Sequence, residues 1–246
     1  MENLSIAAGK EIYDRSIEII NSLLVKNKHF HGGYSDTEKN IVKRVIHASS
    51  DISYADTVFF TGNSAFNSIS LLKKKLISKE AVKIVCDSKM TQAGISTTVN
   101  RDIIVNSATY IGLDEKDLHD SLTLCASRYD FPDKLDYCKH KDHARLTRSA
   151  LSIRAAIIEN LPDFIVIGNA PTALTETIGI CKYLHNHISY KPALVVGMPA
   201  GFVGADLAKN NLKNDPFFSA IGNTGNSGGS PAAAAVINAL FSESFL

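Results

Sequence analysis

The chain has 246 residues, 45 % of them apolar and 21 % charged, a composition typical of a globular protein that can bury a sizeable core. Its 26 Lys and Arg residues against 25 Asp and Glu residues give a formal net charge of +1, so it lacks the basic excess of a general nucleic-acid-binding protein. The apolar stretches fall short of the roughly 20 residues that a membrane-spanning helix needs, and the first residues do not form a signal peptide. We therefore expect a cytoplasmic protein without nucleic-acid or membrane partners, folded as a single domain over residues 1–246.

The cysteines offer little chemistry. All four are widely separated and include no Cys-x-x-Cys pair, which argues against a disulfide framework. Cys138, His140 and His143 could supply three metal ligands, but no second cysteine stands at the spacing of a zinc ribbon. The sequence therefore predicts no metal site.

The predicted elements begin with a helical segment over about residues 1–50. A first helix runs from about Ser5 to Lys28, and the paired glycines of segment 29–34 end it in a loop. Ser35 and Glu38 then have the spacing of a capping box, and the helix that they start turns an apolar face to the core with Ile41, Val42, Val45 and Ile46.

Arg44 and His47 lie on the flank of this apolar face. They are three residues apart, nearly one helical turn, so the guanidinium and the imidazole emerge on the same side of the helix. The pair places a binding cation beside a titratable ring, which would suit the wall of a cleft. The alternative is a surface helix with a hydrogen-bonded histidine and a solvated arginine.

Further along the chain, short apolar runs alternate with helical patterns. The runs predict buried strands at Thr57–Phe60, Val82–Cys86, Ile103–Val105, Phe164–Ile167, Leu194–Val196 and Phe218–Ile221. The helical patterns cover Ser64–Ser78, Asp142–Glu159, Thr172–Leu184 and Pro231–Leu240. This alternation predicts an α/β fold of three layers, a mostly parallel sheet with helices on both faces.

Chemistry in such a fold collects where strands end and helices begin, since loop amides and helix N-termini are exposed there. Three junctions of this kind contain Asn169 to Thr172, Gly201, and the segment Gly222–Ser230, in which Ser230 could cap the last helix. Their amides would suit phosphate or carboxylate groups. A nucleotide-binding enzyme is one alternative, but the last junction lacks the lysine of a P-loop. Asp87, directly after a strand, could either orient a catalytic group or cap the next helix.

Five segments resemble, in the same order, the precorrin-8X methylmutase family. They are Ile12-Tyr13-x-Arg15-Ser16, Arg44-Val-Ile-His47-Ala48, Val85-Cys86-Asp87-x-x-Met90-x-x-x-Gly94, Ile167-Gly-Asn169-Ala-Pro171-Thr172-Ala-Leu174 and Gly197-Met-Pro199-x-Gly201-Phe-Val-Gly204-Ala205. The closing Gly228-Gly229-Ser230 with its alanine-rich helix fits the same pattern. The resemblance spans nearly the full length.

The resemblance implies a methyl shift from C-11 to C-12 of ring C in a tetrapyrrole, precorrin-8X or cobalt-precorrin-8, as part of cobalamin biosynthesis. It implies no cofactor and a homodimer with active sites near the subunit interface. It assigns His47 as proton donor or acceptor, with Ser16, Arg44 and Arg148 as substrate contacts. Further substrate contacts fall on the loop residues Asn169, Thr172, Gly201, Gly228, Gly229 and Ser230.

The chemistry of these residues agrees with that activity. Arginines bind carboxylates bidentately, and a near-neutral imidazole can protonate a conjugated ring system and take the proton back. Because Arg44 disfavours the imidazolium, we expect substrate carboxylates to raise the proton affinity of His47. A non-catalytic corrinoid carrier is the main alternative, since binding alone would not need His47.

Two features depart from the family pattern. The segment Gly222–Ser230 has Asn-Thr-Gly-Asn-Ser where we expect a shorter stretch with a basic residue. The segment from Ala108 to His143, which precedes Arg148, is also longer than in compact members.

Overall fold

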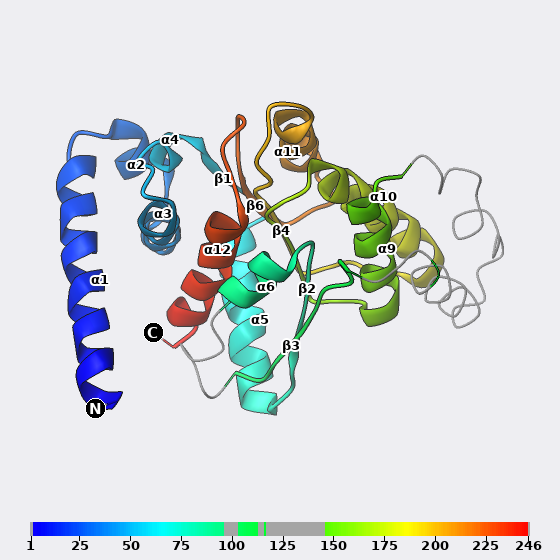
Figure 1. Cartoon of the computed structure of the whole chain (residues 1–246), viewed down its shortest axis with the longest axis horizontal. Helices are drawn as coiled ribbons and strands as arrows, with labels where there is room; N and C mark the ends of the chain where they lie inside the picture. Colours follow the sequence, from blue (N-terminus) through cyan, green and yellow to red (C-terminus); the bar gives the residue numbers. More distant parts are fainter. Residues whose placement is uncertain (1, 96–102, 113–115, 117–145, 246) are drawn as a thin grey trace.

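The computed structural model describes residues 2–95, 103–112, 116 and 146–245. Its centre is a six-stranded sheet with the strand order β1-β6-β5-β4-β2-β3 (Figure 1). β1 is antiparallel to its neighbour β6, and the other neighbouring pairs are parallel. The strands are β1 (Val58–Thr61), β2 (Val82–Cys86), β3 (Val105–Ala108), β4 (Phe164–Ile167), β5 (Leu194–Gly197) and β6 (Ala220–Asn223).

Helices cover both faces of the sheet, because successive residues of a strand point to opposite sides. In β4, Phe164 and Val166 belong to one hydrophobic core, and Ile165 and Ile167 belong to another. The first core continues into α3 (Asp36–Ser49), α5 (Ser64–Ser78) and α12 (Ser230–Glu243). The second continues into α9 (Arg148–Asn160), α10 (Pro171–Ile188) and α11 (Ala205–Asn214). The predicted three-layer α/β fold is confirmed.

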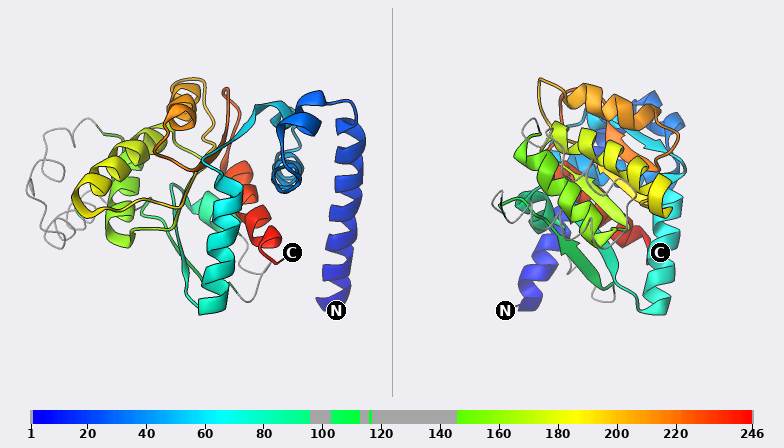
Figure 2. Two further views of the ribbon diagram at one scale, coloured as in Figure 1. Left: turned by 180° about the vertical axis from the view of Figure 1, so that it is seen from behind. Right: turned by 90° about the vertical axis from the view of Figure 1, so that its right-hand side faces the viewer.

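The N-terminal helices form one end of the molecule. α1 (Glu2–Leu24) lies at the edge, and α3 lies between α1 and α12 (Figures 1 and 2). α3 begins with the predicted capping box, in which the Ser35 side chain accepts from the backbone of Glu38 and the Glu38 carboxylate accepts from the backbone of Ser35 at 2.8 Å. The capping bonds stabilise the start of α3, and the buried apolar face of the helix packs against α12.

Some short elements differ from the sequence-based expectation. Segment 29–34, expected as a loop, is mostly the helix α2 (Lys28–Gly33), because the Asn27 side chain accepts from the Phe30 amide at 2.7 Å and Phe30 is buried. The helices α4 (Tyr54–Thr57), α6 (Lys89–Gly94) and α11 were not predicted, and β3 begins two residues later than expected. Residues 142–145 of one expected helix lie outside the described residues.

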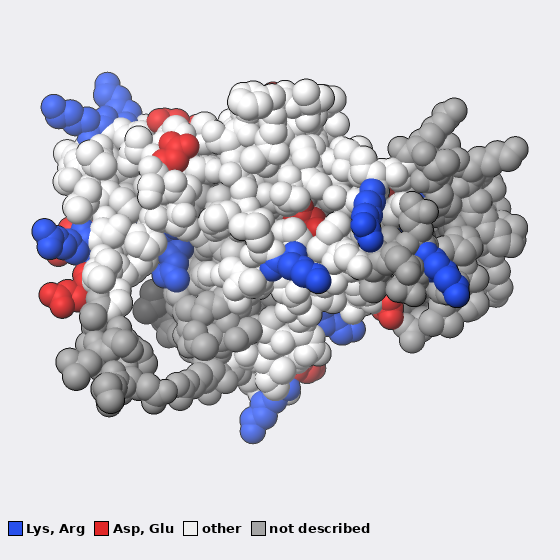
Figure 3. Space-filling view, viewed as in Figure 1, with Lys and Arg blue, Asp and Glu red and all other residues white. Residues whose placement is uncertain are grey.

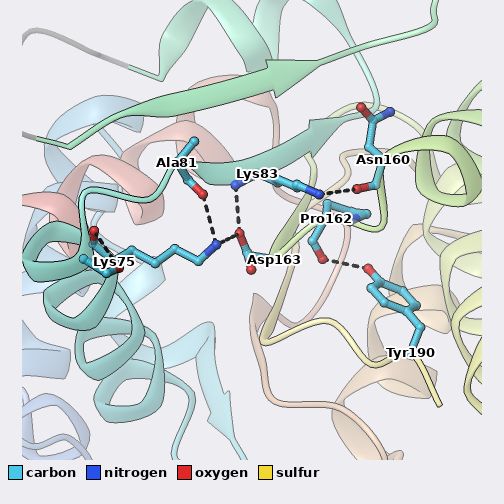
Figure 4. Close-up of polar contacts among 8 residues, drawn as sticks. Lys75, Ala81, Lys83, Asn160, Pro162, Asp163 and Tyr190 are labelled. Carbon is cyan, nitrogen blue, oxygen red and sulfur yellow. Dashed lines mark hydrogen bonds and ion pairs between the residues drawn. The ribbon is translucent and has the colours of Figure 1, made fainter.

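Polar contacts fix the amino ends of β2 and β4 (Figure 4). Asp163 precedes β4, and its Oδ2 accepts from the Lys83 backbone at 2.8 Å and pairs with Lys75 Nζ at 2.7 Å. Lys75 extends from α5, while the Tyr190 hydroxyl donates to the carbonyl of Pro162 at 2.7 Å. These bonds join α5 to β2 and β4 at the amino ends of the two strands. The loops that the sequence analysis selected as candidate binding sites lie at the opposite, carboxyl ends.

Within the described part of the chain, no helix is both long and apolar enough to cross a membrane. On the face shown in Figure 3, the basic side chains of the described residues are dispersed among uncharged ones. The described residues on this face therefore form no continuous basic stripe of the kind that binds nucleic acids.

Candidate active site

His47 is held by a serine from another helix. The Oγ of Ser16, in α1, lies 2.8 Å from Nδ1 of His47, in the last turn of α3. This contact joins two of the predicted site residues that are 31 positions apart in the chain. Because the bond engages Nδ1, it fixes the orientation of the ring and leaves Nε2 as the nitrogen that can exchange a proton with a ligand.

Tyr13 connects His47 with Arg44. Its ring meets the imidazole edge to face at a centroid distance of 5.0 Å, and the Cζ of Arg44 lies 4.9 Å from the centroid of the same ring. An aromatic ring attracts a guanidinium placed over its face, and two rings in contact favour an edge-to-face arrangement. The sequence analysis gave Tyr13 no role, although its spacing of three residues from Ser16 matches the spacing of Arg44 from His47.

The surroundings favour a neutral imidazole. Partial burial, and secondarily the positive charge of Arg44, lower the pKa of His47 below its ordinary value of 6.5. The ring is therefore mostly unprotonated at neutral pH, and a negative charge brought close to it would reverse part of this shift.

A groove of about 400 Å³ opens between α1, α3 and the end of α12. It contains side chains of both signs, and Asn40 Nδ2 donates to Glu243 Oε1 at 3.1 Å across it. His47 lies one helical turn beyond Arg44, against Tyr13, and does not itself line the groove. The lining residues are Tyr13, Asp14, Ile17, Glu18, Asn40, Lys43, Arg44, Ala239, Ser242 and Glu243.

A second group of predicted residues lies at the carboxyl ends of β2 and β4, where the strand order reverses and α/β proteins bind ligands. Asp87 follows β2, but Ser88 caps α6, so the interpretation of Asp87 as the cap of the next helix is wrong. Its carboxylate instead accepts from the backbone amides of Gly168, Asn169 and Ala170. Burial is the main cause that raises the pKa of Asp87, and these bonds oppose it.

Ser230 belongs to the same polar cluster. Its Oγ lies 2.9 Å from the Thr91 hydroxyl and 3.2 Å from the Ser88 hydroxyl. The expectation that Ser230 caps α12 is wrong, because the helix begins at Ser230 itself and follows Gly229 without a side-chain cap. The hydroxyl of Ser230 is engaged by α6 and its cap instead.

The junction Gly222–Ser230 is bonded to the neighbouring loop. The amide of Gly201 donates to the carbonyl of Asn226 at 3.0 Å, and the amide of Gly229 donates to the carbonyl of Met198 at 2.8 Å. A Cβ on Gly228 would lie 2.3 Å from the Met198 carbonyl oxygen, so only glycine fits there. The amides of Gly201 and Gly229, which were expected to face an anion, thus donate to carbonyl groups of the protein itself.

Lys209 brings a cation to this junction. The lysine is fully buried in α11, and its Nζ donates to the carbonyl of Ser227 at 2.7 Å. Burial lowers the pKa of Lys209 to about 8, and the charge of Asp206 opposes the decrease. The junction lacks a basic residue of its own, and α11 places one directly beneath it.

Arg148 and Thr172 lie in the other helical layer. Arg148 is exposed in the first turn of α9, and the hydroxyl of its neighbour Thr147 lies 2.7 Å from that of Thr172. Figure 1 shows α3 and α9 on opposite sides of α12 and the sheet. One chain therefore brings Ser16, Arg44 and His47 together, but it does not bring Arg148 to them.

The possible metal ligands Cys138, His140 and His143 lie outside the described residues. In the described ranges, no group of three or more His, Cys, Asp or Glu side chains is arranged to hold a metal ion.

Taken together, the fold and the imidazole next to a guanidinium are those of an α/β protein equipped for acid–base chemistry. Comparison with known sequences identifies the family. The sequence profile of the precorrin-8X methylmutase family matches residues 11–121 and 129–243, and the chain belongs to this family. It is accordingly a methylmutase, an isomerase of cobalamin biosynthesis.

Individual relatives agree with this assignment. The chain is 31 % identical over 240 residues to the cobalt-precorrin-8 methylmutase of Methanocaldococcus jannaschii, covering 94 % of this chain and 92 % of the relative. It is 28 % identical over 246 residues to the precorrin-8X methylmutase of Pseudomonas aeruginosa, covering 97 % of each. A solved precorrin-8X methylmutase related protein superposes with a TM-score of 0.68 at 27 % identity, covering 94 % of this chain and 100 % of the other.

Proposed function

We propose that the chain moves a methyl group from C-11 to C-12 of ring C of precorrin-8X or cobalt-precorrin-8, with His47 as the proton donor and acceptor. The products would be hydrogenobyrinate or cobyrinate. The observation that carries the proposal is the constellation around His47, whose Nδ1 is fixed by Ser16 and whose pKa lies below its ordinary value. Such a ring is a proton acceptor near neutral pH, and substrate binding can make it a donor.

The proposed mechanism uses one proton and returns it. The carboxylates of the bound tetrapyrrole offset the charge of Arg44, which raises the pKa of His47 in the complex. Imidazolium then protonates the conjugated system, the methyl group migrates between adjacent ring carbons, and imidazole takes the proton back. Atoms balance because substrate and product are isomers.

The loop residues would bind the periphery of the substrate. Asn169 and Thr172 are exposed at the start of α10, so their side chains can reach a ligand. Gly201, Gly228, Gly229 and Ser230 shape the adjoining junctions, and we propose them as further contacts. We also propose that the reaction takes place in the cytoplasm.

The activity is tested by absorbance spectroscopy with precorrin-8X and its cobalt form. We expect the wild type to produce the rearranged corrin chromophore, and His47→Ala to bind the substrate with about 10²- to 10⁴-fold slower conversion. The matched control is His185→Ala, which removes an exposed histidine of α10 and should convert at the wild-type rate. Binding without conversion by the wild type would favour a carrier, and absence of binding would contradict the proposed function.

We further propose that the protein acts as a homodimer and that Arg148 serves the partner's site. The distance of α9 from α3 within one chain supports this arrangement (Figure 1). α1 also exposes Ile12, Ile19 and Leu23 at 69, 54 and 64 % of their surface, and their spacing places them along one side of the helix. An apolar stripe of this kind is suited to contact with a second subunit.

A further inference from the structure

Asp87 is a buried carboxylate that the proposed mechanism does not use. It is 2 % exposed, and both of its oxygens accept hydrogen bonds. Oδ2 accepts from the amides of Asn169 at 2.7 Å and Ala170 at 2.8 Å, and Oδ1 accepts from the amide of Gly168 at 3.1 Å and the hydroxyl of Thr91 at 3.2 Å. Four donors on two oxygens match the acceptor capacity of the ionised group.

The three amides precede α10, an 18-residue helix. Amides at the N-terminus of a helix attract anions, and the sequence analysis expected these to face substrate carboxylates. The next residue, Pro171, has no N–H to offer. The protein's own carboxylate therefore occupies the anion position at this end of α10.

We propose that Asp87 is a positioning residue, an internal anion that fixes the loop 168–170, so that the substrate meets the side chains of Asn169 and Thr172 there and not the loop amides. The inference rests on the proposed function, because it concerns how the same crevice recognises the tetrapyrrole. It goes beyond that function by inferring that the amides of loop 168–170 bind the carboxylate of Asp87 and are not available to the substrate.

The influence of Asp87 extends to α12 through Thr91. The Thr91 hydroxyl lies 3.2 Å from Asp87 Oδ1 and 2.9 Å from Ser230 Oγ, so it bridges the carboxylate and the first residue of α12. A Cβ on Gly168 would lie 2.8 Å from the Cα of Ser230, so the loop and α12 are also in direct contact. Loss of Asp87 should therefore loosen two substrate-binding elements at once.

The decisive variant is Asp87→Ala, which removes the carboxylate and leaves the three amides pointing at the vacated space. Formate carries the missing carboxylate and is small enough to replace it. We expect KM to rise at least about tenfold with a smaller change in kcat, because the lost contacts position substrate and do not transfer protons. Formate should restore KM and raise the melting temperature of the variant, acetate should do so less well, and neither should affect the wild type.

Two controls make the result specific. Asp36→Ala removes an exposed carboxylate from α3 and should show no formate response. Thr91→Val keeps Asp87 but removes the hydroxyl that bridges it to Ser230, so it should also raise KM. Thr91→Ser keeps this hydroxyl and should have the wild-type KM. This second series decides the question if Asp87→Ala fails to fold even in formate.

The proposal is overturned by a folded Asp87→Ala protein with wild-type KM, by the absence of a formate-specific effect, or by wild-type kinetics of Thr91→Val. The melting temperature is measured without substrate, so it reports on Asp87 even if the wild type proves inactive as a methylmutase. Failure of the proposed function and failure of this inference are thus separate outcomes.

Discussion

At the scale of single residues, the chemistry of His47 depends on three neighbours from two helices. Ser16 fixes one ring nitrogen, Tyr13 packs edge to face with the imidazole, and Arg44 contributes a positive charge. A hydrogen bond to a histidine ring sets its orientation, whereas burial and, to a smaller extent, the charge of Arg44 lower the pKa of His47. The geometry and the pKa of the imidazole are therefore controlled by different residues and can be changed separately.

Replacing Arg44 tests how far its charge lowers the pKa of His47. In Arg44→Gln we expect the pKa of His47 to rise but stay below 6.5, because burial, the larger cause of the decrease, remains. NMR titration of the imidazole C–H resonances measures the change, with Lys39→Gln on the same helix as the control. An unchanged pKa would show that Arg44 does not influence the ring.

The same shift affects stability with a defined sign. Because the pKa of His47 is lower in the native protein, the unfolded chain binds more protons as the pH falls below 6.5. The free energy of unfolding therefore decreases as the pH falls from 6.5 through the native pKa of His47. Urea unfolding across this pH range should show a smaller loss for Arg44→Gln than for the wild type.

At the scale of elements, the amino ends and the carboxyl ends of the strands carry different groups of contacts. The carboxyl edge carries Asp87 and the glycine-rich loops, and the amino edge carries the contacts around Asp163 (Figure 4). Strands β2 and β4 connect the two groups of contacts. β2 has Lys83 near its amino end and Asp87 after its carboxyl end, and β4 has Asp163 before its amino end and the loop 168–170 after its carboxyl end. Stability at one edge can therefore be altered without touching groups proposed to bind substrate.

Asp163→Asn tests this separation. We expect it to lower the free energy of unfolding by about 1–3 kcal/mol, because the partly buried Lys75 loses its ion-pair partner. Asp36→Asn breaks an ion pair whose carboxylate is 98 % exposed and should cost less than about 1 kcal/mol. Urea denaturation measures both values. Equal losses would mean that the Lys75 contact contributes no more than a surface pair.

At the scale of the whole molecule, the separation of α9 from α3 leaves the predicted site divided between two regions of one chain (Figure 1). In a twofold dimer the same surface is presented by both subunits, so an arginine far from its own histidine can approach the partner's. The proposal that Arg148 acts in this way concerns assembly and is tested by mixing subunits.

His47→Ala and Arg148→Ala should each have only a small fraction of the wild-type activity when tested alone. After joint unfolding and refolding, half of the dimers contain one of each subunit, and each of these has one site with both residues intact, so about a quarter of wild-type activity should return. Light scattering establishes whether dimers form. No recovery in a confirmed mixed dimer would show that Arg148 serves its own chain's site or none.

The sequence alone determined much of this protein, wherever the signal was local. Continuous apolar runs marked β4 and β5, and Ser35 with Glu38 marked the start of α3, since burial and capping depend on residues close together in the chain. The spacing of Arg44 and His47 likewise predicted their common side of the helix.

Only the tertiary structure decided which distant residues meet. It placed Ser16 and Tyr13 on His47, gave the amides of Gly168 to Ala170 to Asp87, and used Ser230 in a hydroxyl cluster and not as a cap. It also formed α2, α4 and α6, which have six residues or fewer and are too short for a periodic pattern to reveal. The sequence analysis missed α11 as well, whose buried positions follow helical spacing but include Lys209. Periodicity specifies the face that a residue occupies, but the partner on that face is set by how helices and strands pack, which no local pattern records.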